Sequence, residues 1–139
     1  MTDLAVLIDT DVFSFFLRRD SRRLAYRDDM RERMLCLSFA SVAELRFGAI
    51  LSGWGDSRRA ALEGALRGYV MLGVDAAITQ RWAEIKAARQ RIGKPVASED
   101  CWIAATALRY DIPLVTHNAR DYQGIDGLKL VTRADRAKA

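Results

Sequence analysis

Four acidic residues lie beside short apolar segments that are far apart in this sequence. Asp9 follows the apolar run at residues 4–8, and Asp121 follows the run at 114–115 within VTHNARDY. Glu44 in SVAEL and Asp100 in SEDCWIAATA both fall in the first turns of predicted helices. A lone carboxylate is costly to bury among apolar residues. The chain must therefore fold so that these four side chains find polar or ionic partners.

Short apolar runs alternate with helical patterns along the chain. We expect strands at residues 4–8, 35–39, 70–72, 114–115 and 128–131. Helices are expected to begin near Thr10, Ser21, Ser41, Ser57, Asp75 and Ser98. This alternation predicts an α/β fold with a central twisted parallel sheet of four to five strands flanked by helices, in three layers.

The bulk composition is that of one globular domain. The 139 residues, 50% hydrophobic and 29% charged, are expected to form a single domain over residues 1–139. No apolar run approaches the roughly 20 residues needed to cross a bilayer, and acids flank the first run, so we expect a cytoplasmic protein and no membrane association. Cys36 and Cys101 are distant and belong to no CxxC pair, which indicates core residues.

Each acid has a structural explanation when it is taken alone. Asp9 could cap the first helix, and Ser41 with Glu44 matches a capping box. Asp100 would lie favourably in a first helical turn, and Asp121 could close a turn. Their conjunction favours a different interpretation, because the carboxyl ends of parallel strands share one edge of a sheet. Several oxygen ligands at one edge favour one or two Mg²⁺ or Mn²⁺ ions.

Four segments carry a family resemblance: LIDTDVFSFFLRR, SFASVAELRFGA, ASEDCWIAATALRYDIPLVTHNARDY and GLKLV. With these motifs the chain resembles a PIN-domain ribonuclease, and more closely the VapC-type toxin of type II toxin–antitoxin pairs. The resemblance implies that the family's four metal-site acids are Asp9, Glu44, Asp100 and Asp121. It also places Thr116 and Asn118 at the polar positions beside that site.

Two positions depart from the family pattern. Asp11 stands where the family usually has Asn, and it could either join the metal site or cap the first helix; we favour the cap. Glu99 adjoins Asp100, and the register to IAATA favours Asp100 as the ligand. The single histidine, His117, has no triad or zinc-motif context and is interpreted as a loop residue.

The expected chemistry is hydrolysis of RNA phosphodiester bonds by metal-activated water. Asp9 is expected to be the bridging ligand of the metal site. Glu44 and Asp100 are expected to complete the coordination of the first ion, and Asp121 to bind a second ion or act through water. Thr116 and Asn118 would orient water or phosphate. The resemblance further implies a VapB-like antitoxin as partner and a homodimer. Phe13, Phe15 and Phe16 are candidates for the antitoxin groove, with a purely structural role in the core as the alternative.

An arginine-rich stretch offers a possible contact surface for RNA. It contains Arg18, Arg19, Arg22, Arg23, Arg27, Arg31 and Arg33. Arginine suits phosphate oxygens, although a solvated helix face explains the same pattern.

Two other functions are compatible with parts of the sequence. LIDTDV fits the opening motif of an aspartate-based phosphohydrolase of the haloacid dehalogenase type, but Lys129 comes too late for that family's motif order. A catalytically inactive RNA-binding module is the second alternative.

Overall fold

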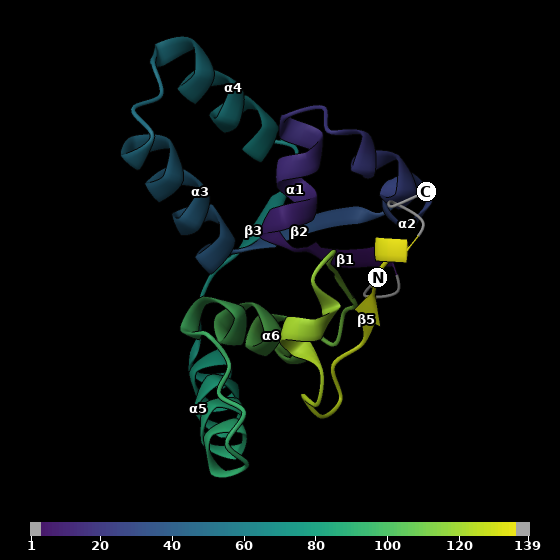
Figure 1. The fold of residues 1–139 in the computed structure, drawn as a ribbon, viewed down its shortest axis with the longest axis vertical. Coiled ribbons are helices and arrows are strands. Elements are labelled where there is room, and N and C mark those ends of the chain that lie inside the picture. The colour runs from purple at the N-terminus through teal and green to yellow at the C-terminus, as the bar shows by residue number, and fades with distance from the viewer. Residues whose placement is uncertain (1–3, 136–139) are drawn as a thin grey trace.

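The computed structural model describes residues 4–135 and contains a five-stranded parallel sheet (Figure 1). The strands are β1 (Ala5–Ile8), β2 (Met34–Ser38), β3 (Val70–Leu72), β4 (Leu114–Val115) and β5 (Leu130–Val131). Their spatial order is β3-β2-β1-β4-β5, and every neighbouring pair is parallel. The fully apolar β1 is central and buried throughout, which is the environment that such a run requires.

Helices connect the consecutive strands. They are α1 (Thr10–Leu17), the 3₁₀ helix η2 (Ser21–Tyr26), α2 (Arg27–Met30), α3 (Phe39–Leu51), α4 (Asp56–Leu66), α5 (Ala76–Arg91), α6 (Ser98–Tyr110) and the 3₁₀ helix η3 (Ala119–Tyr122). Side chains of β1 alternate between two cores: Ala5 and Leu7 pack with α5 and α6, while Val6 and Ile8 pack with α1 and α4. The predicted three-layer α/β fold is confirmed.

The start of α3 differs from the prediction. Ser38, the last residue of β2, caps this helix by accepting a hydrogen bond from the Ala40 amide at 3.1 Å, so the helix begins before Ser41. The capping-box interpretation of Ser41 and Glu44 is therefore wrong. Ser41 is buried inside the helix, and its hydroxyl accepts a hydrogen bond from the Thr10 hydroxyl at 2.9 Å. Glu44 is thus free of a capping role.

Other boundaries shift by smaller amounts. Asp20 rather than Ser21 caps the second helical segment, which starts as a 3₁₀ helix, and the last strand is shorter than expected. Asp75 caps α5 as predicted, because its carboxylate accepts from the Ile78 amide at 2.8 Å.

The expected core residues are mostly confirmed. Cys36 and Cys101 are buried free thiols. Phe13 and Phe15 are also buried, so neither is available to line a groove for a partner; only Phe16 stays partly exposed. Within residues 4–135, no helix is long and apolar enough to span a membrane.

Candidate metal centre

The ends of the two central strands bring the first polar groups of the site together. Ile8 of β1 pairs with Val115 of β4, so Asp9 and Thr116 leave the sheet side by side. The Asp9 carboxylate accepts a hydrogen bond from the Thr10 amide at 2.9 Å and another from the Thr116 hydroxyl at 2.7 Å. Asp9 is only 6% exposed. It therefore caps α1 and also holds a buried carboxylate at the sheet edge.

Glu44 reaches the same edge from α3. The Thr10 hydroxyl lies 3.2 Å from Glu44 Oε1 and 2.9 Å from Ser41 Oγ. This threonine directly follows Asp9, so it links the β1 end to the third helix. Two segments more than 30 residues apart in the sequence are thereby joined at the site.

Asp100 approaches from the first turn of α6. The Tyr122 hydroxyl donates to Asp100 Oδ1 at 3.3 Å, and the same hydroxyl contributes to the electrostatics of the Asp9 carboxylate. Asp100 is half-buried, whereas its neighbour Glu99 is exposed. The orientation of α6 thus directs Asp100, rather than Glu99, towards Asp9.

Asp11 ties the loop after β4 to the first helix. Its carboxylate accepts from the Val12 amide at 2.7 Å, from the His117 amide at 3.1 Å and from the Asn118 side chain at 2.8 Å. The N-cap of α1 is Asp9, so the interpretation of Asp11 as the cap is wrong: Asp11 lies in the first turn of the helix and binds two donors of the opposite loop. Its place in the sequence could not reveal this, because the contacts span more than 100 residues.

His117 is part of the wall of this region rather than an isolated loop residue. Its Nδ1 lies 2.6 Å from the Tyr26 hydroxyl, and its ring packs edge-on against Phe15. The buried hydroxyl of Thr116 accepts a hydrogen bond from the Asn118 amide at 3.0 Å. Asn118 and Asp121 are both exposed near the mouth of the site.

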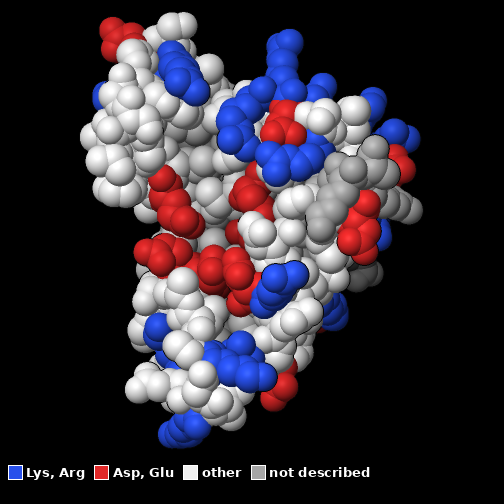
Figure 2. Space-filling view, in the orientation of Figure 1, with Lys and Arg blue, Asp and Glu red and all other residues white. Residues whose placement is uncertain are grey.

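The acids form one electrostatic cluster, which we define as Asp9, Asp11, Glu44, Glu99, Asp100 and Asp121. Burial, and then the charge of Asp11, raise the pKa of Asp9 from 3.8 to about 6. Burial, followed by Asp9 and Asp121, raises the pKa of Asp100 to about 6. Burial is also the main cause of the raised pKa of Glu44 and of Asp11, with other members of the cluster adding to it. Figure 2 shows acidic side chains gathered in the hollow between the two halves of the molecule.

The acids approach one another without forming a closed set of metal ligands. Among residues 4–135, no three acidic, histidine or cysteine side chains are already gathered closely enough to hold a metal ion. Like-charged carboxylates repel one another, and hydroxyl donors from Thr10, Thr116 and Tyr122 occupy some of their oxygens. The donor set itself, which consists of carboxylate and hydroxyl oxygens, suits a hard divalent cation.

A family model for the PIN domain matches residues 6–128. The chain belongs to the PIN-domain family. This PIN-domain protein is 30% identical over 132 residues to VapC ribonuclease Y4jK of Sinorhizobium fredii, covering 87% of this chain and 94% of the relative. It is 28% identical over 126 residues to the tRNA(fMet)-specific endonuclease VapC of Shigella flexneri, covering 91% and 96%. The crystal structure of DNA-bound VapBC from Salmonella typhimurium aligns with a TM-score of 0.82 at 25% identity, covering 93% of this chain and 98% of that one.

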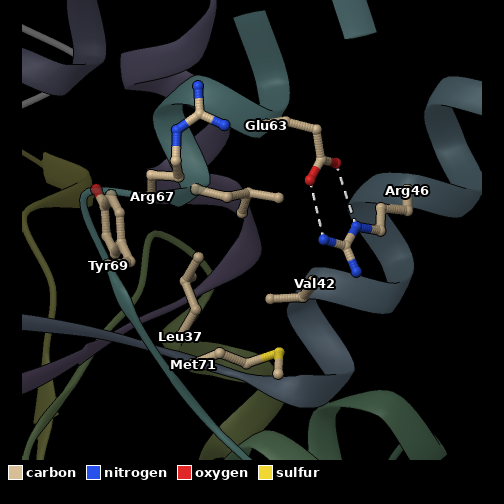
Figure 3. Close-up of a pocket in the computed structure, with 8 residues that line it drawn as sticks. Leu37, Val42, Arg46, Glu63, Arg67, Tyr69 and Met71 are labelled. Atoms are coloured by element: carbon tan, nitrogen blue, oxygen red, sulfur yellow. Dashed lines mark hydrogen bonds and ion pairs between the residues drawn. The ribbon is translucent and has the colours of Figure 1, made fainter. Parts of the chain in front are cut away.

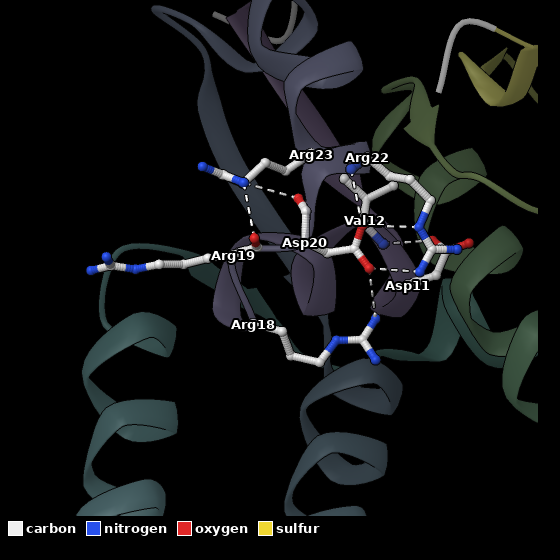
Figure 4. Close-up of polar contacts among 7 residues, drawn as sticks. All are labelled: Asp11, Val12, Arg18, Arg19, Asp20, Arg22 and Arg23. Atoms are coloured by element: carbon white, nitrogen blue, oxygen red, sulfur yellow. Dashed lines mark hydrogen bonds and ion pairs between the residues drawn. The ribbon is translucent and has the colours of Figure 1, made fainter. Parts of the chain in front are cut away.

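An arginine rim lies beside the PIN-domain site, and we define it as Arg18, Arg19, Arg22 and Arg23. Arg22 forms a two-point contact with Asp20 at 2.7 and 3.0 Å, and Arg18 lies 3.9 Å from the same carboxylate (Figure 4). Arg23 donates to the backbone carbonyls of Arg19 and Asp20. One carboxylate thus contacts two guanidinium groups, and the four arginines of the rim leave it with excess positive charge next to the acidic cluster.

Proposed function

We propose that this PIN-domain protein is a divalent-metal-dependent ribonuclease, the toxin of a toxin–antitoxin pair. The observation that carries the proposal is the convergence of Asp9, Glu44 and Asp100 at one sheet edge, where Asp9 raises the pKa of Glu44 and of Asp100, and Asp100 raises that of Glu44. Burying several carboxylates together is costly unless a cation neutralises them. The names of the relatives, which are ribonucleases or endonucleases, support RNA as the substrate class. The family match favours this function over a haloacid dehalogenase-type phosphohydrolase.

The residues of the site divide into candidate ligands and positioning residues. Asp9, Glu44 and Asp100 would hold a Mg²⁺ or Mn²⁺ ion, with exposed Asp121 placed for a second ion or for a water. When bound, such an ion lowers the pKa of water and stabilises negative charge on phosphate oxygens. Thr116 is fully buried, and its hydroxyl donates a hydrogen bond to Asp9. We therefore propose that Thr116 positions this carboxylate and does not contact RNA. Exposed Asn118 would contact the substrate.

Cleavage of a labelled RNA by the purified protein tests the proposal. After treatment with a chelator, cleavage should disappear, and adding Mg²⁺ or Mn²⁺ should restore it. The control is the same RNA with metal and without protein. Cleavage that persists at full rate in excess chelator would contradict a metal-dependent mechanism. Binding of RNA without cleavage under every metal condition would instead favour the inactive RNA-binding module.

We propose that the arginine rim contacts RNA phosphates. Replacing Arg22 or Arg18 by Gln should weaken RNA binding, and it should flatten the slope of log affinity against log salt by about 0.7 per lost phosphate contact. Fluorescence anisotropy at several salt concentrations measures this slope. Arg91→Gln, which changes an exposed arginine at the end of α5, is the matched control. An unchanged slope in both rim variants would mean that the arginine rim is a solvent-exposed face that does not contact RNA.

A VapB-like antitoxin is the proposed partner, in the cytoplasm, with a homodimer as the proposed assembly. The solved VapBC complex of Salmonella typhimurium, which is 25% identical to this chain, supports the proposed partner. On α3, Phe47, Ile50 and Leu51 are 64%, 65% and 74% exposed, an apolar surface suited to a protein partner. Beside it, α3 and α4 enclose a pocket whose rim carries the Arg46–Glu63 ion pair (Figure 3).

A further inference from the structure

Tyr122 is a buried residue of the site that the sequence analysis did not select. It ends η3 and is 1% exposed, with its ring in the core shared by α5 and α6. Its hydroxyl donates to Asp100 Oδ1 at 3.3 Å and also interacts electrostatically with the Asp9 carboxylate. Burial is the main cause of the raised pKa of this phenol, and the two carboxylates add to it.

The position of this hydroxyl between two carboxylates is the informative feature. A buried phenol needs only one acceptor to satisfy its O–H group. Here the hydroxyl lies within reach of two acids from segments about 90 residues apart, whose charges repel each other. Within residues 4–135, the hydrogen-bond donors to Asp9 are the Thr10 amide and the Thr116 hydroxyl, and neither of them hydrogen-bonds Asp100. Tyr122 is thus the group that connects the β1 end with α6.

We propose that Tyr122 is a positioning residue, whose hydroxyl holds Asp9 and Asp100 in the relative orientation that a divalent cation requires. The proposal rests on the proposed function of the site. A donor that touches a carboxylate ligand from behind fixes which oxygen lone pairs remain for a cation, and loss of such a donor commonly weakens metal binding 10- to 100-fold. The loop supports this role, because the Asp121 amide donates to the Asn118 carbonyl at 3.0 Å and so fixes the turn that carries Tyr122.

Tyr122→Phe tests the proposal, because it removes one oxygen and keeps the ring. Mn²⁺ binding to the RNA-free protein, followed by the electron paramagnetic resonance signal of free Mn²⁺, should weaken by about 10-fold or more. Tyr69→Phe is the matched control: Tyr69 packs edge-on against Phe13 in the other core, and its variant should bind Mn²⁺ like the wild type. Circular dichroism should show both variants folded.

A second comparison separates positioning from a general structural effect. In an Asp100→Asn background, the effect of Tyr122→Phe on Mn²⁺ affinity should shrink, because the acceptor charge that the hydroxyl orients is gone. Equal Mn²⁺ affinity of Tyr122→Phe and wild type would overturn this inference and leave the proposed function intact. An unfolded Tyr122→Phe protein, or an undiminished effect in the Asp100→Asn background, would also overturn it. If the wild-type protein binds no Mn²⁺, both the proposed metal-dependent function and the proposed role of Tyr122 are contradicted.

Discussion

Asp9→Asn should abolish RNA cleavage and, at the same time, make the metal-free protein more stable. Asn keeps the oxygen that accepts from the Thr10 amide, and its NH₂ group can donate to the Thr116 oxygen, which reverses the direction of the hydrogen bond that Thr116 now donates. The substitution removes the buried charge on which the proposed cation site depends. We expect cleavage to fall by about 1,000-fold or more, because a bound ion contributes several kcal/mol of charge stabilisation in the transition state.

The gain in stability has a separate cause. At pH 7 the wild-type carboxylate is ionised although burial and Asp11 disfavour its charge, as its raised pKa shows. Asn has no such charge, so the free energy of unfolding should rise by about 1–3 kcal/mol. Urea unfolding of metal-free protein measures this difference. Asp126→Asn, which alters an exposed acid outside the acidic cluster, is the control and should change neither property. Loss of both cleavage and stability in Asp9→Asn would mean that Asp9 supports the fold rather than a cation.

The stability of the metal-free wild type should fall as the pH rises from about 4 through about 6, until it levels off near pH 7. The pKa values of Asp9 and Asp100 are raised from 3.8 to about 6 in the folded protein. Between these values the folded state binds more protons than the unfolded state, so raising the pH favours unfolding. Above about pH 7 both groups are ionised in both states, and their contribution becomes constant.

Thermal unfolding in the presence of a chelator measures this pH dependence. The melting temperature should be higher at pH 5 than at pH 7, and Asp9→Asn combined with Asp100→Asn should reduce the difference. Stability that rises steadily from pH 5 to pH 7 in the wild type, with no effect of the double substitution, would contradict the raised pKa values.

The strand pattern of the sequence was sufficient to predict the sheet, because apolar runs such as the one at residues 4–8 have few alternatives in a chain of this size. Helix starts were less certain, since several Ser and Asp residues compete as caps. Ser38 caps α3 because it is the last residue of β2, where the chain turns into the helix; Ser41, with the better capping motif, is buried instead.

The sequence predicted the acids of the candidate site, but it did not predict the hydrogen bonds that position them. The acids at the strand ends could be expected to converge, since parallel strands share an edge. The contacts that position them could not be predicted, because each joins two different segments of the chain. The Tyr122 hydroxyl bonds Asp100 of α6, and the Asn118 side chain bonds Asp11 of α1. The phenylalanines in α1 were equally ambiguous: helical spacing alone does not show that Phe13 and Phe15 face the core.

The most direct test of the cation-binding acidic cluster is a Mn²⁺ titration of the melting temperature of the RNA-free protein at pH 7.5. A ligand that binds only the folded state stabilises it by RT ln(1 + [L]/Kd), so the wild-type melting temperature should climb with Mn²⁺ concentration. The Asp9→Asn variant should have a higher melting temperature without Mn²⁺, and this temperature should change little as Mn²⁺ is added. A wild-type curve that does not respond to Mn²⁺, or an equal climb in Asp9→Asn, would contradict the account.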